Sequence, residues 1–190
     1  DDVLNAIADT YGMDKHQIIV GNGAAELLYA ICRLPGYTGA FVPAPGFSEY
    51  KEALEASKIP VRDIFYRPRE DDNGKPYFEV PYLALETFAA ELKGQDGRII
   101  VFLGNPNNPD GTLLDKDHIR TVASMLKDAN SLLVIDESFI DFVGNDPLQD
   151  NAHSMRSLVN EFDNIIVVHS FTKFYAVPGL RIGAAFANKT

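Results

Sequence analysis

Short runs of aliphatic residues recur along the chain and alternate with stretches that have helical periodicity. A short apolar run bounded by turn residues is typical of a strand that is buried on both faces of a sheet. Seven runs have this character, at residues 18–20, 40–42, 59–65, 99–103, 132–135, 165–168 and 182–186. Strands that alternate with helices usually form a parallel sheet with helices on both faces. We therefore predict a three-layer α/β fold around a mostly parallel, seven-stranded sheet.

The segments between these runs contain helix signals and one long polar interruption. Apolar residues at helical spacing predict helices at 3–11, after Gly23, near Ser48, at 82–92, after an N-cap at Asp115, and through Met155 and Phe162. Gly94 is expected to end the helix at 82–92. Residues 66–81 are polar and include prolines and an Asn-Gly pair, so we predict a surface excursion there.

Composition and charge narrow the class of protein. The chain has 190 residues, of which 46% are hydrophobic, and this suits one soluble globular domain. Its net charge of −10 weighs against nucleic-acid and anionic-membrane partners, because phosphate groups attract clustered lysine and arginine. With no signal peptide and no long apolar run, a cytoplasmic protein is expected. Cys32, the single cysteine, excludes an internal disulfide and is expected in the core.

Polar or glycine-rich segments follow five of the predicted strands. Gly21 begins a turn after the first strand, a proline loop starts at Pro43, Asn108 lies beyond the fourth strand, Asp136 directly follows the fifth, and Ser170-Phe171-Thr172-Lys173 follows the sixth. The carboxyl ends of parallel strands meet at one edge of a sheet, where open α/β folds bind ligands. The sequence therefore predicts one site built from these segments. None of the four histidines has metal-ligand spacing, so no metal is expected.

A lysine and a buried acid at this edge suit the aldehyde cofactor pyridoxal 5′-phosphate. An acid directly after four buried aliphatic residues is costly unless it meets a cation or a hydrogen-bond donor, so Asp136 is the most informative acid in the chain. Asp136 would pair with the pyridine nitrogen and keep it protonated. Lys173 would form a Schiff base with the aldehyde and later move protons as the free amine. Asp141 and Asp146, by contrast, are predicted to be solvated or structural.

The remaining residues at this edge match the other groups of the cofactor. Asn108 would donate to the ring hydroxyl oxygen, and Phe47 would stack on the ring face. The phosphate would be held by Ser170, Arg181 and the backbone N–H groups of Gly23, Ala24 and Ala25. Each assignment has a plainer alternative: Phe47 could pack in the core, and the Asn-Pro loop and the glycine turn could be ordinary turns.

Three motifs occur together in a fixed order: Asn-Pro-Asn-Asn-Pro-Asp-Gly at 105–111, Asp-Glu-Ser-Phe at 136–139, and Ser-Phe-Thr-Lys at 170–173 with Arg181 eight residues after the lysine. This combination resembles the large domain of fold type I (class I/II) pyridoxal-phosphate aminotransferases, and in particular histidinol-phosphate aminotransferases and threonine-phosphate decarboxylases. The resemblance covers nearly the whole chain. It implies for each matching residue the role given above.

Two residues depart from the family pattern. Asp110 lies where the family often has threonine, and Phe139 lies where a tyrosine commonly donates to the ring oxygen. A phenylalanine cannot donate that hydrogen bond. Asn108 would then be the remaining donor to the ring oxygen.

The resemblance implies an aminotransferase that moves the amino group of an amino acid or amino-acid phosphate to a 2-oxo acid. A threonine-phosphate-type decarboxylase is the alternative within the same chemistry. An aminotransferase-like ligand-sensing or structural module is the alternative of another class, although such a module need not retain both Lys173 and Asp136.

The resemblance also implies that parts of the enzyme lie elsewhere. Residues 1–190 would form the cofactor-binding large domain, a fragment that lacks an N-terminal segment and a C-terminal small domain. Family members bind the substrate carboxylate with an arginine of that small domain and usually act as homodimers. The chain would therefore hold the cofactor but little of the substrate specificity.

Overall fold

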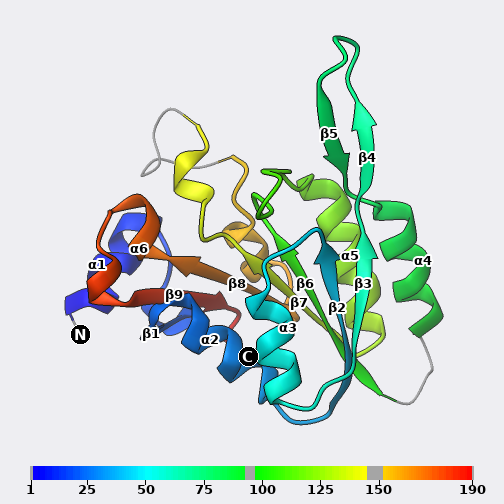
Figure 1. Ribbon diagram of the computed structural model, residues 1–190. Coiled ribbons are helices and arrows are strands. Elements are labelled where there is room, and N and C mark those ends of the chain that lie inside the picture. The colour runs from blue at the N-terminus through cyan, green and yellow to red at the C-terminus, as the bar shows by residue number, and fades with distance from the viewer. Residues whose placement is uncertain (1, 93–96, 145–151, 190) are drawn as a thin grey trace.

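A seven-stranded sheet runs through the middle of the molecule (Figure 1). The computed structural model describes residues 2–92, 97–144 and 152–189. Across the sheet the strands are β1 (Ile18–Asn22), β9 (Ile182–Ala187), β8 (Ile165–Ser170), β7 (Leu132–Asp136), β6 (Arg98–Gly104), β2 (Tyr37–Ala44) and β3 (Val61–Phe65). β9 is antiparallel to both β1 and β8, whereas the other neighbouring pairs are parallel. The predicted α/β fold with a mostly parallel sheet is confirmed.

Helices cover both faces of the sheet and bury two separate cores. On one face, α2 (Gly23–Cys32) and α3 (Glu49–Ala56) contribute to a core that includes the buried thiol of Cys32. Burial raises the pKa of this thiol to about 12, as expected for a core cysteine. The opposite face is covered by α1 (Asp2–Tyr11), α4 (Tyr82–Leu92) and α5 (Lys116–Asp128), as Figure 1 shows.

The central strands are buried on both faces, which explains their continuous aliphatic sequences. Along β6, Val101 and Leu103 point into the core beneath α4 and α5, while Ile100 and Phe102 point into the core beneath α2 and α3. Every residue of β7 is buried, including its last residue, Asp136. Neighbouring residues at the end of β7 are thus directed to opposite sides of the sheet.

The predicted helix at Asp115 begins as expected, because the Asp115 carboxylate accepts hydrogen bonds from the N–H groups of Asp117 and His118.

The prediction for 66–81 was incomplete. This exposed segment forms a hairpin, β4 (Arg67–Glu70) and β5 (Pro76–Glu79), that projects from the sheet in Figure 1.

The predicted last helix was wrong in type. The segment forms a 3₁₀ helix at Arg156–Asn160. Among the described residues, the next α-helix after α5 is the short α6 (Phe171–Phe174). Apolar spacing alone cannot separate the two helix types over such a short segment. Met155, Leu158 and Val159 are nevertheless buried, as the pattern indicated. The predictions for Gly94 and Asp146 fall outside the described residues.

Among the helices of residues 2–92, 97–144 and 152–189, none has the length and apolar character needed to cross a membrane. In the same part of the chain, His, Cys, Asp and Glu side chains nowhere gather in a group of three that could hold a metal ion.

Candidate active site

A cavity of about 200 Å³ lies at the edge of the sheet where β1, β2, β6, β7 and β8 end. Its wall includes the side chains predicted to contact the ring of a cofactor: Lys173, Asp136, Asn108 and Phe47. Ala24, Ala25, Ser170 and Arg181, which were predicted to bind its phosphate, line the same cavity. Gly23 is not part of the wall, but it lies directly against Arg181. The structure thus brings the predicted residues together at one place.

Asp136 is held at the cavity wall by donors from two elements. The Tyr50 hydroxyl, on α3, donates to Asp136 Oδ2 at 2.9 Å. The Ser138 backbone N–H and hydroxyl donate to Asp136 Oδ1 at 2.9 and 2.6 Å. The carboxylate is only 6% exposed, and these bonds provide the partners that a buried acid requires.

Lys173 lies on α6, immediately after β8, and its side chain is exposed. Ser170 and Thr172, three residues and one residue before Lys173, are buried, and their hydroxyl oxygens are 2.8 Å apart. Thr172 also lines the cavity, which the sequence did not predict. The turn from β8 into α6 therefore directs two hydroxyls and one amine to the same edge.

Close contacts between backbone and side chains shape the part of the cavity near α2. Gly23 has a φ of +81°, and a Cβ at this position would lie 2.8 Å from an Arg181 guanidinium nitrogen. Gly183, on β9, approaches the first turn of α2 so closely that a Cβ there would lie 2.5 Å from the Ala24 nitrogen. Arg181 itself has a left-handed backbone, with φ 49° and ψ 54°. The helix N-terminus and the guanidinium are consequently next to each other, an arrangement that suits an anion.

The Asn-Pro loop places one asparagine at the cavity and uses the other two for its own structure. Asn108 lines the cavity, whereas Asn105 and Asn107 are buried. Asn107 Nδ2 donates to the Pro45 carbonyl and to Asp110 Oδ2. Asp110 also accepts the Thr112 N–H at 2.8 Å, so this departure from the family pattern stabilises the loop.

Sequence reasoning missed three further residues with polar side chains at the cavity: Tyr50, Ser138 and Glu49. Tyr50 follows Phe47 by three residues, and helical spacing at the start of α3 was the available signal that both rings share one side. Their rings are 5.6 Å apart and nearly perpendicular. Phe139 lines the cavity and leaves its wall apolar where the family pattern has a hydroxyl.

The opposite side of the sheet edge contains a buried polar cluster that does not reach the cavity. Asp141, predicted to be solvated or structural, is 3% exposed and is therefore not solvated. Its Oδ2 atom lies 3.0 Å from His169 Nε2 and accepts the Tyr11 hydroxyl at 3.1 Å. Burial, followed by the Asp141 charge, raises the pKa of the Tyr11 hydroxyl far above its usual value, so Tyr11 stays a donor.

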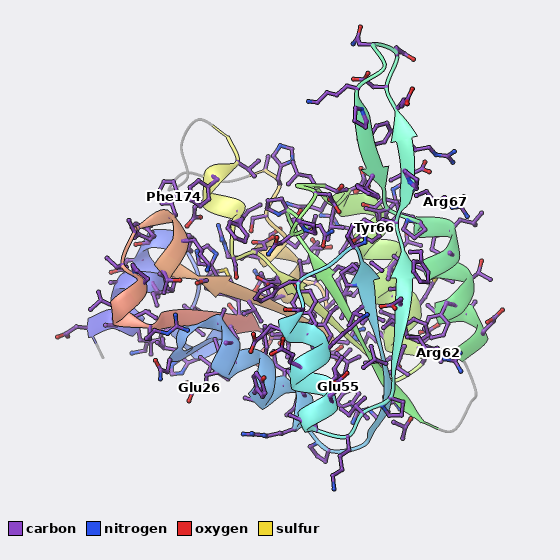
Figure 2. All side chains as sticks on the ribbon, viewed as in Figure 1. Glu26, Glu55, Arg62, Tyr66, Arg67 and Phe174 are labelled. Carbon is purple, nitrogen blue, oxygen red and sulfur yellow. The ribbon has the colours of Figure 1, made fainter. Side chains whose placement is uncertain are left out.

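Aromatic side chains surround the surface beside the cavity. Phe142 is 58% exposed and its ring lies 5.2 Å from Phe174 of α6. Figure 2 shows Phe174 at the outer end of α6, away from the central sheet. Tyr175 continues this cluster at 5.3 Å from Phe174. Phe174 and Tyr175 directly follow Lys173 in the sequence, and Phe142 joins them from the segment after β7.

The whole chain, residues 1–190, matches the family of class I and II aminotransferases. The chain belongs to this family. Pyridoxal 5′-phosphate is the cofactor of class I and II aminotransferases, in agreement with the prediction from the sequence.

Relatives of this aminotransferase-family chain have more than one activity in their names. The adenosylcobalamin biosynthesis bifunctional protein of Leptospira interrogans is 34% identical over 183 residues, which are 96% of this chain and 19% of that protein. Histidinol-phosphate aminotransferase 1 of Trichormus variabilis is 30% identical, over 96% of this chain and 45% of the relative.

A solved structure agrees with the family assignment. The L-threonine-O-3-phosphate decarboxylase of Porphyromonas gingivalis superposes with a TM-score of 0.71 at 26% identity, over 99% of this chain and 49% of that one. The chain thus spans less than half the length of each relative described here.

Proposed function

We propose that this chain is the cofactor-binding part of a pyridoxal-phosphate-dependent aminotransferase that acts on a small amino acid or amino-acid phosphate. The observation that supports this most directly is that Lys173 and Asp136 line the same cavity as Arg181 and the first turn of α2. An amine, a carboxylate and an anion-binding corner are the three features that this cofactor needs. The family relationship supports the same conclusion.

The donor set of the cavity fits the cofactor. The missing Cβ at Gly23 leaves room for the Arg181 guanidinium beside the α2 N-terminus, and this corner would take the phosphate. Phe47 and Asn108 would contact the ring, and the Asp136 carboxylate would accept a hydrogen bond from the protonated ring nitrogen. The bound cofactor withdraws electrons from the α-carbon of the substrate amino acid.

Lys173 has two roles in this proposal. Its Nζ atom would hold the cofactor through the aldehyde carbon, and as the free amine it would accept and return the α-carbon proton. Its exposed position on α6 gives Nζ the freedom to move between these roles. Asp136, in contrast, is fixed by three hydrogen bonds. A mobile base next to a rigid carboxylate suits proton transfer at a fixed ring.

Decarboxylation of an amino-acid phosphate is the second candidate, because the similar Porphyromonas gingivalis structure is a threonine-phosphate decarboxylase. Lys173 and Asp136 would serve both reactions. The outcome depends on which α-carbon bond the substrate-binding groups turn toward the ring face. Release of carbon dioxide from amino-acid phosphates without added 2-oxo acid, measured on the full-length protein, would favour decarboxylation. Amino transfer to a 2-oxo acid without carbon dioxide release would favour the aminotransferase.

The site assignment can be tested by trapping. The full-length protein is incubated with pyridoxal 5′-phosphate, reduced with borohydride and digested, and the modified lysine is located by mass spectrometry. We expect visible absorbance before reduction and modification at Lys173. The Lys173→Ala variant should lose the label. Lys51→Ala is the matched control, because Lys51 pairs with Asp63 at the surface, away from the cavity. A label at another lysine would contradict the assignment.

The homodimer and the cytoplasmic location expected from the sequence stay predictions, as does the assignment of residues 1–190 to a large domain. Sedimentation of the full-length protein with and without cofactor measures the first of these. A mass equal to one chain at micromolar concentration would contradict it.

A further inference from the structure

Tyr50 is the residue that connects the carboxylate of the cavity to the core beneath it. It belongs to α3, it is 2% exposed, and its hydroxyl donates to Asp136 Oδ2 at 2.9 Å. The two residues are 86 positions apart in the sequence. The hydrogen bond therefore joins α3 to the end of β7 at the cavity.

The Tyr50 ring has little freedom to move. It stacks on Phe102 of β6, with centroids 5.2 Å apart and planes at 13°. Phe47 meets it edge-on on another side. Because the ring is fixed, the position of its hydroxyl relative to Asp136 is fixed as well. Binding of a ligand therefore costs no further conformational entropy of the Tyr50 side chain.

The hydroxyl acts as a donor under all ordinary conditions. Burial, and then the charge of Asp136, raise the pKa of the Tyr50 hydroxyl well above its usual value, so it keeps its proton. A hydrogen bond donated to a carboxylate favours the charged form of that carboxylate. Ser138 gives the other carboxylate oxygen two donors of its own.

We propose that Tyr50 is a positioning residue that keeps Asp136 oriented and charged, so that a proton shared between Asp136 and the cofactor ring nitrogen stays on the nitrogen. This inference rests on the proposed function, since it concerns the cofactor at the same cavity. Tyr50 is not among the residues proposed to contact the cofactor. Its effect on the ring nitrogen would come through Asp136. A charge-assisted hydrogen bond of this kind changes the ratio of the two proton positions about tenfold.

The first test follows the proton directly. The full-length protein is loaded with pyridoxal 5′-phosphate that is labelled with ¹⁵N in the ring, and the nitrogen chemical shift is recorded for the wild type and for Tyr50→Phe. The variant keeps the packed ring and removes only the hydroxyl. We expect its nitrogen signal to move toward the value of unprotonated pyridine.

Two further variants give the expected order of effects. Ser138→Ala should move the signal less than Tyr50→Phe, because the Ser138 backbone N–H still donates to Asp136. Tyr66→Phe is the matched control and should leave it unchanged. Tyr66 is buried at the base of the β4–β5 hairpin (Figure 2), and its hydroxyl has no hydrogen-bond partner among the described residues.

The second test needs no cofactor. Urea unfolding of the unliganded protein is measured for Tyr50→Phe, Asp136→Asn and the double variant. We expect the loss caused by Tyr50→Phe to be smaller in the Asp136→Asn background, because the partner is then uncharged. Purely additive losses would contradict the coupling.

The outcomes separate this inference from the proposed function. If the wild type shows no bound cofactor, the proposed function fails and the role of Tyr50 toward the ring nitrogen fails with it. If the cofactor binds and the nitrogen signal is the same in wild type and Tyr50→Phe, only the Tyr50 inference is overturned.

Discussion

Asp136 and Glu137 are consecutive acids at the end of β7, yet their surroundings differ in almost every respect. Asp136 forms part of a cavity wall and keeps one side of its carboxylate toward the cavity. Glu137 is 0% exposed on the opposite side of the sheet. It accepts hydrogen bonds from Asn105 Nδ2, the Ser154 hydroxyl and the Met155 N–H, and it lies 3.6 Å from the Arg156 guanidinium.

The difference shows how one strand end can serve two purposes. Both oxygens of the Glu137 carboxylate accept hydrogen bonds from protein groups. Glu137 therefore connects the ends of β6 and β7 to the segment at Arg156–Asn160. The side of Asp136 retains capacity for a ligand. Chemical type alone does not separate the two acids, because both follow the same aliphatic run. Only the faces of the sheet do so.

The largest expected effect concerns Glu137. Glu137→Gln would leave the buried Arg156 guanidinium without its negative partner and would place an amide group against N–H and O–H donors. We expect the free energy of unfolding in urea to fall by about 3–5 kcal/mol. Asp136→Asn, the matched change on the cavity side, should lower it by less than half of that amount while weakening function far more. Equal losses of stability in the two variants would remove the distinction between the two sides.

The next effect concerns the packing on the cavity side. In Gly183→Ala the new Cβ would meet the α2 backbone at 2.5 Å, so β9 and α2 must separate. We expect a loss of about 1–3 kcal/mol in the free energy of unfolding and weaker binding of pyridoxal phosphate. Gly179→Ala is the control, because no atom of the described residues lies within 4 Å of a Cβ at that position. If both variants unfold with the same free energy as the wild type, the contact between β9 and the first turn of α2 can adjust more than its geometry indicates.

The smallest effect comes from a third acid, Asp115, which is exposed at the start of α5. The His118 N–H, followed by its imidazole, holds the pKa of Asp115 below its usual value. A lowered pKa in the folded state means that Asp115 stabilises the fold above about pH 4 and stops doing so as the pH falls through the folded value. Asp115→Ala should therefore cost about 1 kcal/mol at pH 7 and progressively less as the pH falls below about 4. Thermal unfolding across this range, with Asp117→Ala as control, measures the difference.

Much of the fold followed from the sequence because its signals are local. Aliphatic runs identified all strands of the central sheet, and their common direction indicated which segments would meet at one edge. The short segment around Met155 was assigned to the wrong helix type, since its N-terminal end is held by hydrogen bonds from Ser154 and Met155 to Glu137 rather than by helical repetition. The hairpin was only partly foreseen, because its strands lie outside the sheet and have no buried face.

The candidate site was predictable because most of its residues lie shortly after a strand of the sheet, and Arg181 directly precedes one. Tyr50 was missed because its partner, Asp136, is far away in the sequence. For Asp141 the sequence left a solvated and a structural role open, because His169 and Tyr11, which cover it, come from distant parts of the chain. The sequence shows which chemical groups are present, whereas long-range packing decides which of them remain available to a ligand.

The tip of the β4–β5 hairpin is a suitable position for inserting a reporter or tag into this protein. It projects away from the sheet (Figure 1), its first strand is fully exposed, and its tip is closed by Asp71, which accepts the N–H groups of Asn73 and Lys75. Exposed tips of small and polar residues are the positions that best accept inserted sequence. A fluorescent reporter or an immobilisation tag inserted beside Gly74 would therefore lie far from Lys173, and cofactor loading could be followed on a protein whose catalytic edge is left untouched.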